Sequence, residues 1–264
     1  MPAPTIARKP IPKFSKSDLN IANQCATALW HGINFKTGDF RQISEAYLLA
    51  RFATNFYNYQ STGNQFTPGV FEQNIRELII ACGIKMLFRG IADMNIKKGI
   101  TSLYKDVYPK FLSFQKNPNQ KSSFQTSVAC LEKLNKGLVR NSKSNRLNLA
   151  SRILFFVTPN LHTFNMNNNI AIFFGLQWRP HHHYAEYFEL FSKGMITNQT
   201  NLSKYKIPKA RDGLDDLTWN KIKGTDWWKR RVLDMAVLLL VDKKMTVNPN
   251  LNSYIRQRQK LDTI

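Results

Sequence analysis

Apolar residues recur three and four positions apart through most of the chain, and alternation with a period of two is rare. This spacing places apolar side chains on one face of a helix, which then packs on a core. The run Leu147–Val157 is the clearest example: apolar residues line one face at first and fill its last turn, and Pro159 stops it. The pattern predicts an all-α, multi-helix globular fold.

The remaining elements follow from the same spacing and from turn residues. Helices are predicted over residues 19–31, 39–59, 71–86, 98–108, 124–137, 170–174, 184–193 and 226–244, and Ser17 with Asp18 is expected to cap the first. Residues 1–16 form a proline-rich, basic arm, expected to be extended on the body or on a phosphate backbone. Residues 17–264 are expected to form a single α-helical domain, with a division into two subdomains near 115–145 as the alternative.

The net positive charge of the chain bears on its function. The 264 residues include 38 basic and 17 acidic side chains, a net charge of +21, while 43% are hydrophobic and support a core. Basic residues concentrate in segments 97–152 and 204–260. Such an excess favours a polyanionic partner, with nucleic acid ahead of a membrane surface, although lysines spread evenly over the solvent face are the alternative interpretation.

The compartment is predicted from cysteines and apolar runs. Cys25, Cys82 and Cys130 lie far apart in apolar helical contexts, which favours buried, reduced thiols. The N-terminal segment has no apolar run typical of a secretory signal, and no stretch reaches the eighteen apolar residues of a spanning helix. We expect a cytoplasmic, nucleoid-associated protein without a membrane partner.

A polar hairpin, residues 160–169, follows the run at 147–157 and contains five asparagines. Together with Ala150-Ser151-Arg152, Phe155-Phe156-Val157, Pro159, Ile170-Ala171 and Gly175-Leu176, this region resembles the core of the helix-hairpin-helix DNA glycosylase superfamily, which includes oxoguanine glycosylases. The resemblance implies a helix-hairpin-helix glycosylase-like fold. It covers the middle of the chain and a C-terminal helix.

The resemblance also implies where catalytic groups would stand. The superfamily's acidic residue matches Asn167, and its frequent lysine matches Arg152. An amide cannot neutralise a sugar cation, and a guanidinium cannot form a Schiff base at neutral pH. We therefore expect no catalytic residues, unless Asp234 is a carboxylate that has moved into the site. We favour a structural role instead, in which Asp234 pairs with Arg230, four residues earlier.

The segment 178–184 carries three consecutive histidines. Neighbouring helical residues point about 100° apart, so they seldom bind one ion, and only His182 with Glu186 keeps the spacing of a metal pair. We expect no metal and no cofactor. Trp178 and Arg179 would instead stack on a base or contact phosphate, unless Trp178 belongs to the core.

These observations predict a catalytically inactive, glycosylase-like scaffold that binds duplex DNA with little sequence preference. Relatives of this kind and the Lys/Asn-rich composition suggest a bacterial source and a role in phage defence or a mobile element. The predicted contacts are Lys143, Arg146, Arg152, Asn165, Asn167, Asn168, Asn169, Trp178, Arg179, Lys229 and Arg230, with hairpin amides offered to a phosphate. An active glycosylase/AP lyase of base-excision repair and an RNA-binding subunit of a ribonucleoprotein are the alternatives.

Overall fold

The computed structural model describes residues 8–40, 43–52, 77, 127–132, 134–136, 147–157, 159, 161–176, 183–209, 216–242 and 245–261. Among these residues 66% are helical and none forms a strand, so the prediction of an all-α, multi-helix fold is confirmed. The single β-type contact in this part of the chain is an isolated antiparallel bridge between Ile33 and Phe40.

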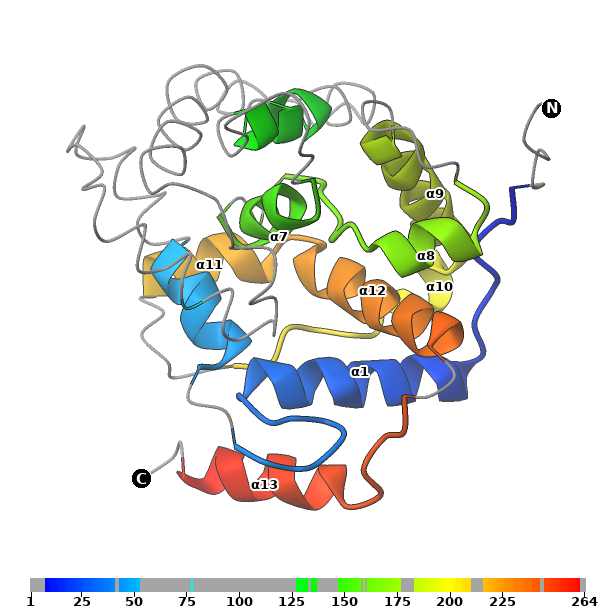
Figure 1. The fold of residues 1–264 in the computed structure, drawn as a ribbon. Helices are drawn as coiled ribbons and strands as arrows, with labels where there is room; N and C mark the ends of the chain where they lie inside the picture. Colours follow the sequence, from blue (N-terminus) through cyan, green and yellow to red (C-terminus); the bar gives the residue numbers. More distant parts are fainter. Residues whose placement is uncertain are drawn as a thin grey trace, which may run out of the picture.

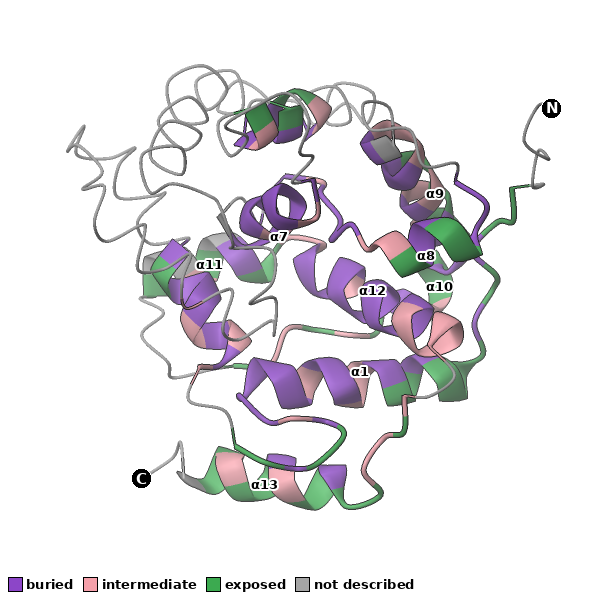
Figure 2. Ribbon diagram, in the orientation of Figure 1, coloured by how far each residue is buried: buried purple, intermediate pink, exposed green. Residues whose placement is uncertain are grey.

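Helix α12 (Trp227–Val241) lies at the centre of the described helices (Figure 1). It is buried on nearly all sides over its first turns, as the burial colours show (Figure 2). Helix α1 (Lys16–Trp30) packs along it, and the Trp30 ring lies 5.8 Å from that of Trp227 and 5.7 Å from that of Trp228. Both tryptophans of α12 therefore belong to the buried core.

The start of α1 differs from the prediction. Ser15, not Ser17, is the N-cap: its hydroxyl accepts the amide of Asp18 at 3.1 Å, while the Asp18 carboxylate accepts the amide of Ser15 at 3.1 Å. This reciprocal pair is a capping box, which requires the acid three residues after the serine. The spacing fits Ser15 with Asp18, so the helix begins at Lys16.

The second predicted helix also begins later than expected. Residues 34–39 form a turn, in which the amide of Gly38 donates to the carbonyl of Asn34, and helix starts only at Glu45. The Ser44 hydroxyl accepts the amide of Tyr47 at 2.9 Å and so caps this helix, which is described to residue 52. Residues 77, 127–132 and 134–136 are helical within their predicted segments, and the rest of 71–86 and all of 98–108 lie outside the described residues.

The two helices that flank the polar hairpin lie close to their predicted positions in the sequence. Helix α7 spans Leu147–Val157, as predicted, and α8 spans Asn168–Phe173, two residues earlier than its predicted start. Asn167 is the N-cap of α8, and its side-chain oxygen accepts the amides of Asn169 and Ile170 at 2.9 and 3.4 Å. Gly175 follows with a φ of 73°, a conformation that side chains with a Cβ rarely adopt.

The C-terminal third holds more helix than predicted. Helix α9 spans His183–Thr197, four residues beyond its expected end, and three helices were missed: α10 (Gln199–Leu202), α11 (Asp216–Lys223) and α13 (Leu251–Leu261). Helix α13 packs on the turn at 34–39, where a Cβ on Gly38 would lie 2.4 Å from the Tyr254 ring. No helix in the described ranges has the length and apolar character needed to cross a membrane.

The described part of the N-terminal arm lies on the body. Ile11 and Phe14 are buried, and the amide of Phe14 donates to the Asn198 side chain at 2.8 Å. The Asn198 amide group in turn donates to the carbonyls of Pro12 and Gly194 at 3.0 and 2.9 Å. These contacts fix residues 11–14 beside α9 and α10.

Candidate functional site

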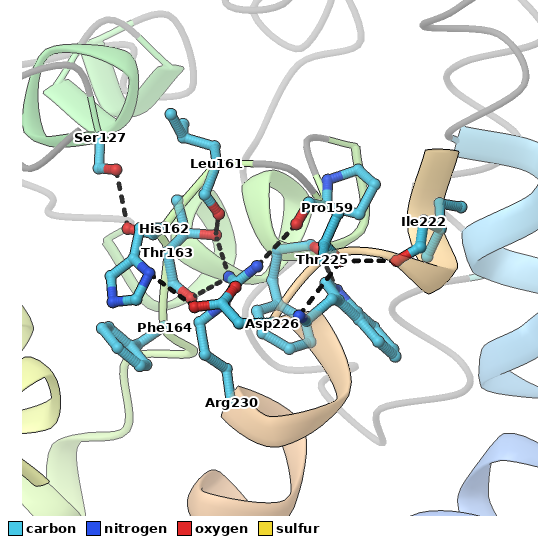
Figure 3. Close-up of polar contacts among 12 residues, drawn as sticks. Ser127, Pro159, Leu161, His162, Thr163, Phe164, Ile222, Thr225, Asp226 and Arg230 are labelled. Atoms are coloured by element: carbon cyan, nitrogen blue, oxygen red, sulfur yellow. Dashed lines mark hydrogen bonds and ion pairs between the residues drawn. The ribbon is translucent and has the colours of Figure 1, made fainter. Parts of the chain in front are cut away.

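A buried arginine holds the polar hairpin against α12. The Arg230 side chain is fully buried, and its Nη1 and Nη2 donate to the carbonyls of Thr163 and Pro159 at 2.6 and 2.7 Å (Figure 3). Its Nε donates to Oδ1 of Asp226 at 2.8 Å. One side chain therefore links the end of α7, the hairpin and the start of α12.

Asp226 joins this anchor to His162. Its Oδ2 lies 2.9 Å from Nδ1 of His162, whose backbone carbonyl accepts a hydrogen bond from Ser127 (Figure 3). Burial raises the pKa of Asp226, but the charge of Arg230 and the hydrogen bond from His162 outweigh burial and hold that pKa well below its usual range. Both carboxylate oxygens of Asp226 are therefore engaged in ion pairs, and its side chain does not cap α12. The Thr225 hydroxyl instead accepts the amide of Trp227, the first residue of α12, at 3.2 Å.

The prediction that Arg230 contacts nucleic acid is wrong. Its side chain is 0% exposed, and its three nitrogens donate to groups inside the protein. A phosphate cannot reach such a guanidinium without opening the core. The role of Arg230 is to position the hairpin.

The hairpin's backbone amides are also used inside the protein. Four of them donate to internal acceptors: Thr163 to the Leu161 carbonyl, Phe164 to the Tyr184 hydroxyl, Met166 to the Ser151 hydroxyl, and Asn169 to the Asn167 side chain. These amides are therefore not available to a phosphate, whereas phosphate binding by the other amides of the hairpin stays a prediction. An amide that already has a good acceptor gains little from a second one.

A second buried arginine organises the opposite side of α12. Arg231 donates from Nε and Nη2 to both oxygens of Glu45, at 2.9 and 2.6 Å, and from Nη1 to Oδ2 of Asp234 at 2.7 Å. The prediction that Asp234 forms an ion pair within its own helix is confirmed, but its partner is Arg231 and not Arg230. Burial raises the pKa of Asp234, and the charges of Arg231 and Arg152 only partly oppose it.

These groups line a cavity of about 250 Å³ between α7, α8 and α12. The polar lining comprises Glu45, Arg152, Asn165, Asn167, Arg231 and Asp234. The structure thus brings together the residues at the two expected catalytic positions, Arg152 and Asn167, with the carboxylate proposed as a relocated acid. Asn165 is buried here, and its Nδ2 donates to Asp234 at 3.4 Å, so this side chain is engaged inside the protein while its contact with nucleic acid stays a prediction.

Some of the other predicted site residues are described by the structure and some are not. Lys143, Arg146, Trp178 and Arg179 lie outside the described residues, as do His181 and His182. Asn168 and Lys229 are half-buried and Asn169 is exposed. In the described part of the chain no three His, Cys, Asp or Glu side chains gather as metal ligands.

Cys25 and Cys130 are buried free thiols. Burial raises the pKa of Cys25 to about 12, although the positive charge of Arg231 partly opposes this increase.

The structure brings together basic segments that are far apart in the sequence. The Asn201 side chain donates to the carbonyl of Phe14, and the Tyr205 hydroxyl donates to Asn20 of α1 at 2.6 Å. These contacts bring the arm, the start of α1 and the segment after α10 together. We call four of the exposed lysines on these segments the basic strip: Lys13, Lys16, Lys204 and Lys206. Its members come from two ends of the chain, so the local charge count could not reveal it.

Comparison of the chain with protein-family models, with curated proteins and with solved structures gives no match. The resemblance to helix-hairpin-helix glycosylases therefore stays a prediction, and function must be argued from the charges and the cavity.

Proposed function

We propose that this protein binds nucleic acid, duplex DNA in particular, through exposed lysine and arginine side chains and without base excision. The net charge of +21 is the observation that carries this proposal. Polyanion binding uses such an excess because each phosphate contact releases a condensed counterion.

The distribution of acidic groups strengthens the argument. Three described carboxylates, those of Glu45, Asp226 and Asp234, are bound to the two buried arginines of α12. These acids therefore do not neutralise surface lysines. The exposed lysines of the described residues keep a positive charge that can attract a polyanion.

The basic strip supplies a specific interface. Lys13, Lys16 and Lys206 are exposed and form no ion pair with any described acid, and Lys204 only approaches the ring of Tyr205, at 5.1 Å. Side chains of this kind track a phosphate backbone without reading its sequence. This interface replaces Arg230 and the engaged hairpin amides as the proposed contact surface. A role in phage defence or a mobile element belongs to the same proposal.

Replacing Lys13, Lys16, Lys204 and Lys206 by Gln should weaken duplex DNA binding and its salt dependence. Each phosphate contact contributes about 0.9 to the slope of log affinity against log salt, so the slope should flatten by about three to four units. The measurement is a fluorescence anisotropy titration at several salt concentrations, with duplex DNA, single-stranded DNA and RNA compared.

The matched control replaces Lys36 and Lys223, which are also exposed but belong to the turn at residues 34–39 and to the end of α11. This variant should leave the slope close to that of the wild type, because neither lysine is expected to contact a phosphate, whereas loss of two contacts would flatten it by about two units. An unchanged slope in the four-lysine variant would place the binding surface elsewhere. Tighter binding of RNA than of duplex DNA would favour the ribonucleoprotein alternative.

An active glycosylase is the second candidate, because Asp234 lies in the same cavity as Arg152 and Asn167. We expect no excision: Asp234 is held by Arg231 at 2.7 Å, and Asn167 is an amide that caps α8. Duplexes with damaged bases should yield neither abasic sites nor borohydride-trapped complexes with wild type, Asn167→Asp or Asp234→Asn protein. Wild-type turnover that disappears in a folded Asp234→Asn variant would support the glycosylase instead.

A further inference from the structure

The main chain of residues 9–14 is bound by α8, α9 and α10 and the turns that follow α8 and α9 (Figure 1). Four hydrogen bonds make this contact: from the Lys9 amide to the Phe174 carbonyl at 3.2 Å, from the Phe14 amide to Asn198 at 2.8 Å, from Asn198 to the Pro12 carbonyl at 3.0 Å and from Asn201 to the Phe14 carbonyl at 3.3 Å. We call the body side of this contact the arm-binding face: Phe174, Gly194, Asn198 and Asn201. Main-chain groups are the same in every peptide, so these bonds hold a segment without reading its side chains.

Only two side chains of this segment are enclosed. Ile11 is 4% exposed and Phe14 is 7% exposed. Pro12 and Lys13, which lie between them, are exposed. The sequence requirement of the arm-binding face is therefore Ile-x-x-Phe, in which the two middle positions are free to vary.

Two residues of the arm-binding face are suited to an occupant. A Cβ on Gly194 would lie 2.9 Å from Cδ1 of Ile11, so only glycine leaves room for this side chain. Glycine is otherwise unfavourable inside a helix such as α9. Asn198 is 1% exposed, and its Oδ1 accepts the Phe14 amide. Without an occupant this buried oxygen would lose that donor, so the face keeps an affinity for a peptide main chain.

The arm can leave this face without unfolding α1. The capping box of α1 is formed by Ser15 and Asp18 alone, so it stays intact when residues 9–14 are released. Ordering six residues costs conformational entropy of the same order as two buried apolar side chains and four hydrogen bonds return. Docked and released arms are therefore close in free energy, and a competing segment can replace the arm.

The charges around the face disfavour the arm relative to an acidic segment. Asn201, which binds the Phe14 carbonyl, is followed by the exposed lysines Lys204 and Lys206. The arm adds the positive charge of Lys13 to this basic region of a chain with a net charge of +21. An acid at that position would replace repulsion by attraction. The arm of a second copy would bring the same positive charge and is therefore the poorer occupant.

We propose that the arm-binding face binds an extended segment of a partner protein with the pattern Ile-x-x-Phe and an acidic residue between the two apolar ones. Residues 9–14 of this chain are the internal competitor of that segment. This interaction does not depend on nucleic-acid binding.

Two fluorescein-labelled peptides test the proposal by anisotropy on the full chain: residues 9–15 with Lys13→Glu, called the acidic peptide, and the unchanged residues 9–15. The chain variant Ile11→Ser/Phe14→Ser releases its own arm. It should bind the acidic peptide with a dissociation constant of about 0.1 mM, and the wild type about 10- to 100-fold more weakly, because a tethered arm competes at millimolar effective concentration. The unchanged peptide should bind the variant about threefold more weakly than the acidic one.

Three results would contradict the proposal: no binding of the acidic peptide at about 1 mM to the variant, equal binding to variant and wild type, or tighter binding of the unchanged peptide. An acidic peptide with Ser in place of Ile11 and Phe14 is the matched control and should not bind. Adding Gly194→Leu to the variant should abolish binding by filling the place of Ile11. Circular dichroism establishes that each chain is folded, and undiminished binding in the folded Gly194→Leu chain would overturn the proposal.

A measurement on the wild type needs no variant. Acidic peptide at about 5 mM should speed hydrogen exchange of the Phe14 amide about tenfold, because it displaces the arm that protects this amide. The control peptide should leave the exchange rate unchanged. An exchange rate that does not respond to the acidic peptide would show that the peptide does not replace the arm and would overturn the proposal.

Discussion

Replacing Arg230 by Ala should lower the free energy of unfolding by about 3–5 kcal/mol. The guanidinium is fully buried and donates to the carbonyls of Pro159 and Thr163 and to Asp226. Its removal leaves these acceptors without their donor and leaves the Asp226 carboxylate with His162 alone. Breaking a buried ion pair from one side is costly because the remaining charge loses its compensation.

Urea unfolding followed by circular dichroism measures this effect. Lys229→Ala is the matched control, since it removes one positive charge from the adjacent position of α12, where the side chain is only half-buried. The control should change stability by about 0.5 kcal/mol or less. A loss of less than about 1 kcal/mol in Arg230→Ala would mean that the hairpin is not held by this arginine.

Replacing Trp227 by Ala should cost a similar amount, about 3–5 kcal/mol. The Trp227 ring is 0% exposed and lies 4.8 Å from Phe155 and 5.8 Å from Trp30, measured between ring centroids. Its Nε1 also donates to the carbonyl of Phe155 at 2.7 Å. The substitution therefore opens a large cavity at the junction of α1, α7 and α12 and removes a buried hydrogen bond.

The same urea unfolding experiment tests this prediction. Trp219→Ala on α11 is the comparison, because that side chain is only partly buried against the core. It should lose clearly less stability than Trp227→Ala. Equal losses in the two variants would contradict the central position assigned to α12 (Figure 2).

Local sequence determined the helices whose pattern is strong. The bounds of α7 follow from an apolar run stopped by Pro159, and the asparagines before α8 signalled a turn and a cap. The same information missed α13, because only Leu251 and Ile255 on that helix are buried and its other residues are largely polar. A helix with so small an apolar face is defined by what it packs against, here the turn at residues 34–39.

For the candidate site too, the sequence indicated some features and only the structure showed the others. The resemblance singled out Arg152, Asn167 and Asp234, and the structure places all three on one cavity. The resemblance could not show which oxygen and nitrogen atoms of these side chains lack partners, because that depends on every neighbouring side chain. Likewise the lysines of the basic strip come from residues 13–16 and 204–206, and only the packing of the arm on α10 brings them together.

The sequence alone determined that α12 carries two consecutive arginines near acids, but not which arginine meets which acid. Spacings of three and four residues both bring side chains together on a helix, so Asp234 could pair locally with Arg231 or Arg230. The tertiary structure decided: Arg230 turns toward the hairpin and Asp226, whereas Arg231 turns toward Glu45 and Asp234. The reason is that α12 is buried on nearly all sides, so each guanidinium must find acceptors in the particular element packed against its own face.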